Sequence, residues 1–265
     1  MDISEKKRIV IKVGTSTIAH KTGNLNIRTM RRITRILSDI KNSGKEIVLV
    51  SSGAVGLGIG LLGLKERPTD IPTKQALASV GQCELMSIYD DMFGKYSVIV
   101  SQVLLTRNIE ELKHVENAFN KLLEFGVVPI VNENDTVAID ELIPSYGEND
   151  TLAAIVAEII KADLLVIMSD VDGIYDSDPH INPDAKIIQF VQNIDEHIEK
   201  IAGGASTSLG SGGMATKINA AKIAMKANIP MLIMNGDNPE NLYDLFDGKL
   251  IGTDKCTLFY NKPIL

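Results

Sequence analysis

Six short runs of apolar, often β-branched residues constrain the fold more than any other feature of the chain. They span residues 8–13, 46–51, 97–103, 127–132, 164–169 and 230–235. Each run is apolar nearly throughout, which is typical of strands buried on both faces of a parallel sheet. Helix-compatible patterns occupy residues 27–41, 73–93, 109–124, 149–161 and 216–227. Strands that alternate with helices predict an α/β sandwich around a mainly parallel sheet.

Composition excludes several classes of protein. The chain has 265 residues, of which 45% are hydrophobic, so it can bury a large core. No apolar stretch approaches the length of a membrane span, and the N-terminus shows no targeting segment. Cys83 and Cys256 lie far apart in apolar patterns, which argues against a disulfide framework or a zinc site and favours a reducing cytoplasm.

The charge distribution favours a small anionic ligand. A formal net charge of −7 argues against a general nucleic-acid binder. Between Glu199 and Asp237, however, there is no Asp or Glu, whereas four lysines occur there. A positive pocket in an acidic protein suits a small anion better than a polyanion.

Small and polar residues follow four of the apolar runs. The segments are GTST after the first run, SGAVGLG after the second, ENDTVA after the fourth and DVDGIYDSDP after the fifth. Ligands of open α/β sheets bind beyond the carboxyl ends of the strands. These four strand ends are therefore expected to converge on one crevice.

The first two of these segments suit phosphate or another anion. Lys12 lies inside an apolar run, which costs free energy unless the amine is paired or reaches solvent at the sheet edge. The small residues that follow it would let a phosphate approach the backbone. After the second run, residues 51–54 could bind an anion at a helix start, although a plain strand-to-helix turn explains them equally well.

Two similar clusters of amides and carboxylates occur at residues 132–135 and 147–150. Asn149 or Asp150 would also serve as an N-cap for the helix over 149–161. The first cluster has no such explanation, because the residues after it read as extended. Together the clusters could bind the ammonium and carboxylate groups of one small ligand.

The loop at residues 169–173 and the motif GIGLLG at 58–63 invite other interpretations. The loop fails the EF-hand spacing, so a turn or a nucleotide contact explains it better than calcium. GIGLLG matches a dinucleotide-binding pattern and leaves a dinucleotide-dependent oxidoreductase as an alternative. The motif starts several residues after its strand, however, and lacks the acidic residue expected about twenty positions later.

The segment from Gly203 to Lys217 contains five glycines and no acid, and it runs directly into a helical pattern. Such backbone can lay N–H groups against phosphates, and Lys217 adds a charge beside the positive helix end. A mobile surface loop would explain the glycines but not the helix.

No nucleophile with an adjacent base is evident in the sequence. Phosphoryl transfer to an ionised acceptor needs positioning and positive charge instead.

Six segments occur along the chain in this order: VIKVGTST, VLVSSGAVGLG, PIVNENDTVA, GENDTLAA, MSDVDGIYDSDP and GSGGMATK. Together they resemble the amino acid kinase family over nearly the whole chain. Relatives acting on acetylglutamate or aspartate usually carry Gly-Gly where this chain has Gly14-Thr15-Ser16. The resemblance therefore favours the branch that phosphorylates the side-chain carboxylate of L-glutamate, the first step of proline synthesis.

The resemblance implies an open αβα sandwich and one domain over residues 1–265. Its N-terminal part would bind glutamate and its part from about 165 to 265 would bind ATP. A homo-oligomer in the cytoplasm, use of ATP with Mg²⁺, and feedback inhibition by proline are also implied. Neither a nucleic acid nor a membrane is expected as a partner, and the chain resembles the short form without a C-terminal PUA-type domain.

The resemblance also implies roles for individual residues. Lys12 and Lys217 would stabilise the transferring phosphoryl group, and Asp150 would hold both lysines. The glutamate contacts would be Ser52, Gly53, Asn134, Asp135 and Asn149. The ATP contacts would be Lys12, Gly14, Ser169, Asp170, Ser211, Gly212, Gly213, Met214, Ala215, Thr216 and Lys217. No metal ligand is assigned.

Two alternatives keep the same fold. One is another kinase of the family, acting on acetylglutamate, aspartate or a nucleoside monophosphate. The other is a non-catalytic sensor of small molecules, which the presence of Lys12, Asp150 and Lys217 disfavours.

Overall fold

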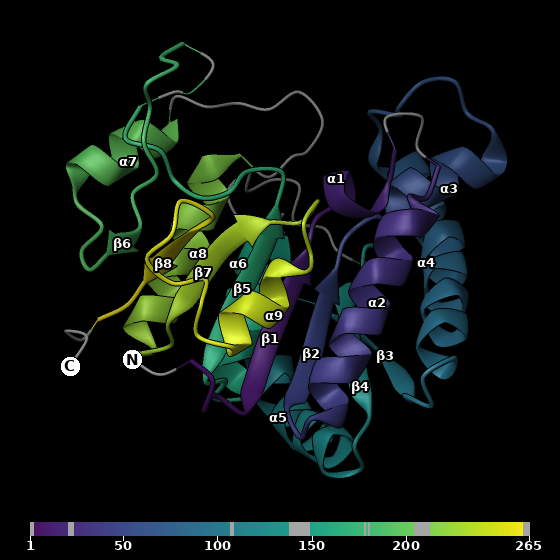
Figure 1. The fold of residues 1–265 in the computed structure, drawn as a ribbon. Coiled ribbons are helices and arrows are strands. Elements are labelled where there is room, and N and C mark those ends of the chain that lie inside the picture. The colour runs from purple at the N-terminus through teal and green to yellow at the C-terminus, as the bar shows by residue number, and fades with distance from the viewer. Residues whose placement is uncertain are drawn as a thin grey trace.

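The structure is a computed structural model that describes residues 3–20, 24–106, 109–137, 149–177, 179, 181–203 and 213–261. One eight-stranded sheet runs through it in the order β3-β4-β2-β1-β5-β7-β8-β6 (Figure 1). The strands are β1 Arg8–Val13, β2 Glu46–Ser51, β3 Val100–Leu105, β4 Val128–Glu133, β5 Leu164–Ser169, β6 Phe190–Val191, β7 Met231–Asn235 and β8 Cys256–Phe259. Every neighbouring pair is parallel except β7 and β8.

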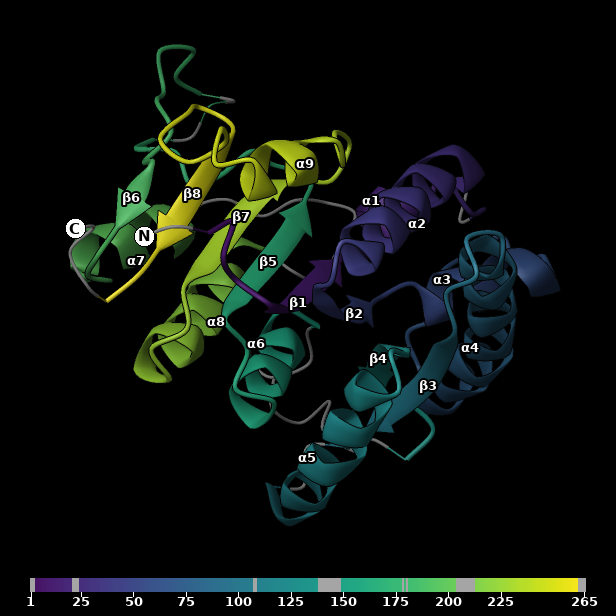
Figure 2. The ribbon, with the colours of Figure 1, turned by 60° about the horizontal axis from the view of Figure 1, so that its bottom comes forward.

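Helices cover both faces of the sheet, as the two views show (Figure 2). They are α1 Thr15–Ile18, α2 Ile27–Asn42, α3 Ala54–Leu62, α4 Ile71–Gly94, α5 Ile109–Glu124, α6 Asn149–Ile159, α7 Glu196–Gly203, α8 Met214–Lys226 and α9 Asn241–Phe246. Buried residues of α2, α4 and α9 pack in one core cluster with one face of the sheet. Those of α5, α6 and α8 pack in a second cluster with the other face. The predicted α/β sandwich with a mainly parallel sheet is therefore confirmed.

The strand order places β4, β2, β1 and β5 side by side. These are the four strands whose polar carboxyl ends were expected to converge. Val13 and Ser51 lie in register at the ends of β1 and β2, and Ser52 N donates to Val13 O at 3.1 Å. Parallel pairing therefore brings four short polar segments to one edge of the sheet.

Two local predictions were wrong. The third apolar run was placed at residues 97–103, whereas β3 begins only at Val100. Ser97 has a positive φ of 58° and Val98 N still bonds to Phe93 O, so these residues turn the chain away from α4. The residues after Asp135 were expected to be extended, but Val137 N bonds to Asn134 O at 3.1 Å and closes a turn. Residues 138–140 of that prediction lie outside the described part of the chain.

The motif GIGLLG lies inside α3 and not in a strand-to-helix turn. A Cβ at Gly58 would lie 2.1 Å from Leu77 O, and one at Gly81 would lie 1.8 Å from Ala54 O. Only glycine permits two helix backbones to approach this closely. Gly58 and Gly81 therefore pack α3 against α4, and Gly63 of the motif caps the end of α3 with a positive φ of 66°.

Candidate active site

Three charged side chains meet at the carboxyl ends of β1 and β5, where α6 and α8 begin. Lys12 Nζ lies 2.6 Å from Asp150 Oδ1, and Lys217 Nζ lies 3.3 Å from Asp150 Oδ2. Lys12 is 7% exposed, Asp150 1% and Lys217 4%. These three residues are called the charged triad below. They form one buried cluster, although Lys12 and Lys217 lie more than 200 positions apart in sequence.

Each member of the charged triad is placed by a different element. Lys12 lies near the end of β1, where it is in register with Val50 and Ile167 of the neighbouring strands. Asp150 is the second residue of α6, and Lys217 lies in the first turn of α8. The positive end of a helix favours a carboxylate in its first turn. Lys217 lies beside such a positive end itself, so it adds to the positive potential there.

The Asp150 carboxylate is held in its ionised form. Burial alone raises the pKa of this carboxyl, but attraction to Lys12 and Lys217 and hydrogen bonds from Lys12 and Thr216 outweigh burial. The net result lowers the pKa of Asp150 to about 2. Two lysines against one carboxylate leave the charged triad with one excess positive charge, which suits an anionic ligand.

Thr216 links this triad to the segment that precedes α8. Its hydroxyl lies 3.0 Å from Asp150 Oδ2 and 2.8 Å from the carbonyl oxygen of Gly213. The hydroxyl carries one hydrogen, so it donates to one of these acceptors at a time. Thr216 was predicted only as an ATP contact, and its bond to Asp150 is a feature that the sequence did not reveal.

A neutral set of side chains lies next to the charged triad. Asn149 Nδ2 donates to Ser52 Oγ at 2.8 Å and to Asn132 Oδ1 at 3.0 Å. Asn132 Nδ2 donates in turn to Gln82 Oε1 at 2.8 Å. The structure therefore brings together Ser52 and Asn149, two predicted glutamate contacts, and adds Asn132 and Gln82 behind them. Asn149 uses its side chain for these bonds, whereas helix capping by Asn149 or Asp150 was the other interpretation of the sequence.

The other predicted acceptor residues lie near these strand ends. Gly53 has φ +108° at the start of α3, a backbone conformation that favours glycine. Asn134 N donates to Leu105 O at 2.8 Å, which holds the segment after β4 against β3. Asp135 begins the turn that follows.

The predicted ATP residues lie beyond β1, β5 and the start of α8. A Cβ on Gly14 would lie 3.4 Å from Lys12 Nζ, so the backbone after β1 passes close to the charged triad. Ser169 Oγ donates to Asp170 Oδ1 at 3.0 Å at the end of β5. Gly213 precedes α8, and Met214, Ala215 and Thr216 form its first turn. Ser211 and Gly212 lie outside the described residues.

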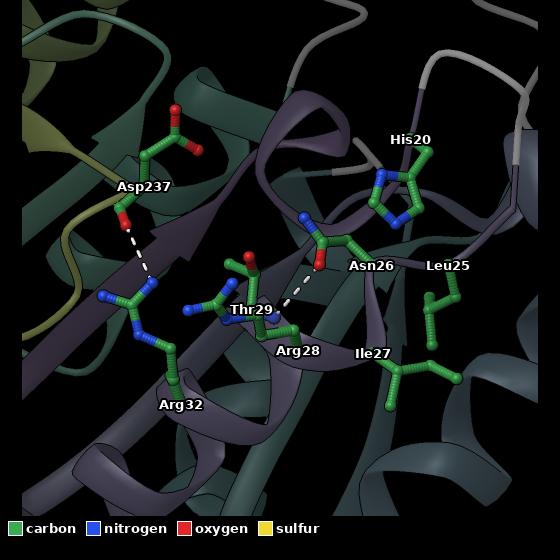
Figure 3. Close-up of a pocket in the computed structure, with 8 residues that line it drawn as sticks. All are labelled: His20, Leu25, Asn26, Ile27, Arg28, Thr29, Arg32 and Asp237. Carbon is green, nitrogen blue, oxygen red and sulfur yellow. Dashed lines mark hydrogen bonds between the residues drawn. The ribbon is translucent and has the colours of Figure 1, made fainter.

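A separate pocket of about 580 Å³ lies between the start of α2 and the segment after β7. Figure 3 shows its lining: His20, Leu25, Asn26, Ile27, Arg28, Thr29, Arg32 and Asp237. Arg32 Nε donates to Glu240 at 2.9 Å and Arg32 Nη1 donates to the Asp237 carbonyl at 3.1 Å. Asn26 accepts from Thr29 N and so caps α2. Within this pocket Arg32 is bound to Asp237 and to the neighbouring Glu240, and Asn26 is bound to Thr29.

Two general properties bear on function. Within the described residues, no three His, Cys, Asp or Glu side chains gather into a group that could bind a metal ion. Over the same part of the chain, no helix is both long enough and apolar enough to cross a bilayer.

Known proteins resemble this chain along nearly its full length. Glutamate 5-kinase of Clostridium perfringens is 50% identical over 257 residues, covering 95% of this chain and 96% of that protein. Glutamate 5-kinase of Listeria monocytogenes EGD-e is 49% identical over 257 residues, covering 95% and 93%.

Solved structures share the fold at lower identity. UMP kinase from Ureaplasma parvum matches with a TM-score of 0.66 at 20% identity, covering 97% of this chain and 99% of that chain. Isopentenyl phosphate kinase of T. acidophilum, in a product complex, matches with a TM-score of 0.65 at 20% identity, covering 96% and 100%. The sequence profile of the amino acid kinase family matches residues 7–235. The chain therefore belongs to the amino acid kinase family.

Proposed function

We propose that the protein transfers the γ-phosphoryl group of ATP to the side-chain carboxylate of L-glutamate and forms L-glutamyl 5-phosphate, the first step of proline synthesis. Relatives named glutamate 5-kinase, about half identical over nearly the whole chain, support the substrate. The observation that carries the chemistry is the charged triad, a buried group of two lysines and one ionised carboxylate with one excess positive charge.

The proposed chemistry needs no general base. The side-chain carboxylate of glutamate is ionised at neutral pH, so one of its oxygens can attack the phosphoryl group directly. Negative charge is spread over the phosphoryl oxygens in the transition state. Lys12 and Lys217 would stabilise this charge, because their amines are fixed in a buried site of low dielectric constant.

Asp150 has a positioning role in this proposal. It stays ionised at neutral pH because its pKa is about 2. Its two oxygens contact the two amines separately, at 2.6 Å and 3.3 Å, so one carboxylate sets the position of both lysines. Asp150 would hold the lysines in place and would not exchange a proton during the reaction.

The remaining predicted residues would divide between two substrates in one domain over residues 1–265. Glutamate would contact Ser52, Gly53, Asn134, Asp135 and Asn149, at the ends of β2 and β4 and the start of α6. ATP would contact the part from about 165 to 265 together with Lys12 and Gly14. Its predicted contacts there are Ser169, Asp170, Ser211, Gly212, Gly213, Met214, Ala215, Thr216 and Lys217.

Mg²⁺ is proposed as the companion of ATP. Mg²⁺ keeps several waters and is commonly held by substrate phosphates with only one or two carboxylates. Such binding needs no cluster of protein ligands, which agrees with the described residues. The ion would supply further positive charge to the phosphate oxygens.

Three further properties are proposed on the family resemblance. They are a cytoplasmic location, assembly as a homo-oligomer and inhibition by proline at or near the glutamate site. The acidic balance of the chain, with a net charge of −7, supports the proposal that neither nucleic acid nor an anionic membrane is a partner.

Trapping of acyl phosphate with hydroxylamine tests the proposed reaction. Purified protein receives Mg-ATP and separately L-glutamate, N-acetyl-L-glutamate, L-aspartate or UMP, while ADP release is followed in parallel. Hydroxamate with glutamate alone, suppressed by proline, is the expected result. Hydroxamate with another amino acid, or ADP release with UMP alone, would overturn the assignment of glutamate as the acceptor. Inactivity with all four acceptors would favour a non-catalytic sensor.

A further inference from the structure

A chain of neutral hydrogen bonds connects the interior of α4 to the edge of the candidate site. It consists of Gln82, Asn132, Asn149 and Ser52 and is called the amide chain below. Gln82 is 8% exposed and Asn132 is 4% exposed, whereas Asn149 and Ser52 are partly exposed. The four residues come from α4, β4, the start of α6 and the segment after β2. The amide chain thus starts in the core and ends at two predicted substrate contacts.

The amide chain has a direction. Each carboxamide nitrogen donates and each carboxamide oxygen accepts. Asn149 commits both hydrogens of Nδ2, one to Ser52 Oγ and one to Asn132 Oδ1. Its carbonyl oxygen is then the group that Asn149 offers to a ligand. Ser52 Oγ accepts in this arrangement, and no acceptor for its own hydrogen occurs among the described residues, so this hydrogen can be donated to a ligand oxygen.

Gln82 determines this direction at the buried end. Its Oε1 accepts from Asn132, which turns the oxygen of Asn132 toward Asn149. Its Nε2 is buried and has no hydrogen-bond partner within the part of the chain that the structure describes. A buried N–H without a partner is unfavourable, because it has lost its hydrogen bonds to water. Packing alone does not account for a glutamine here, because an apolar side chain of similar length would fill the same space, whereas only the glutamine oxygen accepts from Asn132 Nδ2.

We infer that Gln82 is a positioning residue which, through Asn132 and Asn149, keeps the Ser52 hydroxyl hydrogen free to bind a carboxylate oxygen of the acceptor substrate. This inference rests on the proposed function and adds a residue that the sequence did not indicate. Two amide side chains, those of Asn132 and Asn149, separate Gln82 from Ser52. Gln82 therefore acts on the substrate only through them.

The close packing of α3 against α4 supports this role. Gly81 is next to Gln82, and a Cβ at Gly81 would clash with the carbonyl oxygen of Ala54. Ala54 is the second residue after Ser52. The backbone that carries Gln82 is therefore fixed against the backbone that follows Ser52. Both ends of the amide chain are held by the same helix contact.

Gln82→Met tests the inference because methionine keeps most of the volume and removes the acceptor oxygen. The variant is expected to raise the KM for glutamate about tenfold. This increase is at the lower end of the loss of affinity expected when one hydrogen bond to a charged group is removed. The kcat and the KM for ATP are expected to change less than about threefold, because the charged triad is untouched. The melting temperature is expected to fall slightly, because Asn132 Nδ2 loses its acceptor while the unpaired Nε2 of Gln82 is removed at the same time.

Two controls separate positioning from general structure. Gln102→Met makes the same substitution at an exposed position of β3, outside the amide chain. Leu85→Ala weakens the core on α4, one turn after Gln82, without touching a polar group. Both controls are expected to keep the wild-type KM for glutamate, and Leu85→Ala to lower the melting temperature. An unchanged KM in Gln82→Met, or the same KM increase in Leu85→Ala, would overturn the inference.

A measurement without substrate keeps the inference separate from the proposed reaction. The side-chain NH₂ signal of Asn149 in ¹⁵N NMR spectra, identified by its loss in Asn149→Ala, reports both of its hydrogen bonds. Slow exchange of this signal with solvent in the wild type, and faster exchange in Gln82→Met but not in Gln102→Met, is expected. Equal exchange in all three proteins would overturn the inference even if glutamate is phosphorylated. If glutamate is not phosphorylated by the wild type, the proposed function fails, whatever the NMR result.

Discussion

Asn149 and Asp150 are consecutive residues in the first turn of α6, yet they belong to two different polar regions. Asp150 joins the charged triad, where every partner is ionised or donates to a carboxylate. Asn149 joins the amide chain, where every partner is neutral. One helix start therefore separates a charged region, for which we propose stabilisation of developing charge, from a neutral region, for which we propose orientation of the acceptor. The two regions should affect different kinetic constants.

The two regions also differ in what holds them together. Buried ion pairs give little net stability, because desolvation cancels much of the attraction. The charged triad is therefore better explained by its effect on a ligand than by its contribution to folding. The amide chain leaves Gln82 Nε2 without a partner among the described residues, so it too is not optimised for stability. Both regions carry a cost that a purely structural core would avoid.

Removal of either lysine of the charged triad is expected to have the largest effect. Lys12→Ala and Lys217→Ala should each lower kcat roughly 10²–10³-fold, because each removes a fixed positive charge that acts mainly in the transition state. The KM for glutamate should change far less. Steady-state kinetics with glutamate and ATP varied separately measures both constants.

Lys222→Ala is the matched control for these variants. Lys222 lies on α8 with Lys217, but it is exposed and paired with Glu199. Wild-type kinetics are expected for it. A wild-type kcat in Lys12→Ala or Lys217→Ala, or a change confined to the glutamate KM, would remove the distinction between the two regions.

Gly81→Ala is expected to have the next largest effect, on stability and on the neutral region. Its Cβ would lie 1.8 Å from the Ala54 carbonyl oxygen, so α3 must move away from α4. Overpacking of this kind costs about 3 kcal/mol in the free energy of unfolding. The KM for glutamate should rise as well, because α3 begins two residues after Ser52. Urea unfolding and kinetics measure the two effects.

Gly94→Ala provides the control on the same helix. No atom lies within 4 Å of a Cβ at Gly94, and its φ is not positive. This variant should be neutral or stabilise by up to about 1 kcal/mol, because alanine reduces the freedom of the unfolded chain. If Gly81→Ala is as stable as Gly94→Ala, the close contact between α3 and α4 does not support the amide chain.

The sequence revealed the charged region more fully than the neutral one, for a physical reason. Continuous apolar runs report burial on both faces, which is why β1, β2 and β5 were placed correctly. A lysine inside such a run is conspicuous, and a motif resemblance connected it with Asp150 and Lys217. Neither signal depends on distances in three dimensions.

The role of Gln82 and the bond from Thr216 to Asp150 could not be predicted in the same way. A polar residue in a helical pattern reads as part of a solvated face, and only the packing of α4 shows that Gln82 is buried against Asn132. The helix patterns read from the sequence did not include α3, although a helix start was expected at residues 51–54, because its glycines disfavour a helix in isolation. Their reason is the approach of α4, which is a tertiary contact.

The pH dependence of stability tests the ionised state of Asp150. Its pKa is lowered from 3.8 in the unfolded chain to about 2 in the folded protein. A lowered pKa contributes stability above the unfolded value, and this contribution is lost as pH falls through the folded value. The free energy of unfolding should therefore drop by about 2 kcal/mol between pH 4 and pH 2 on account of this residue.

Asp150→Asn removes this titration and provides the comparison. Urea unfolding of both proteins at steps from pH 5 to pH 2 gives the difference in unfolding free energy as a function of pH. The difference should shrink as pH falls, because only the wild type loses stability from this carboxylate. A difference that stays constant across this range would show that Asp150 is not held ionised by the two lysines.

Arg32→Met is expected to have the smallest effect and marks the limit of the charged region. Arg32 lies in the pocket of Figure 3, where Glu240 and the Asp237 carbonyl already bind its guanidinium. The pair is partly exposed, with side-chain exposures of 31% and 44%, so water and salt screen it. Its loss should cost less than about 1 kcal/mol of unfolding free energy and leave kcat and both KM values unchanged. Glu240→Gln, the matched change on the partner, should behave alike. A tenfold loss of activity in either variant would mean that cations close to the strand ends act on the reaction even when they are exposed and paired. Burial would then no longer explain why the charged triad differs from its surroundings.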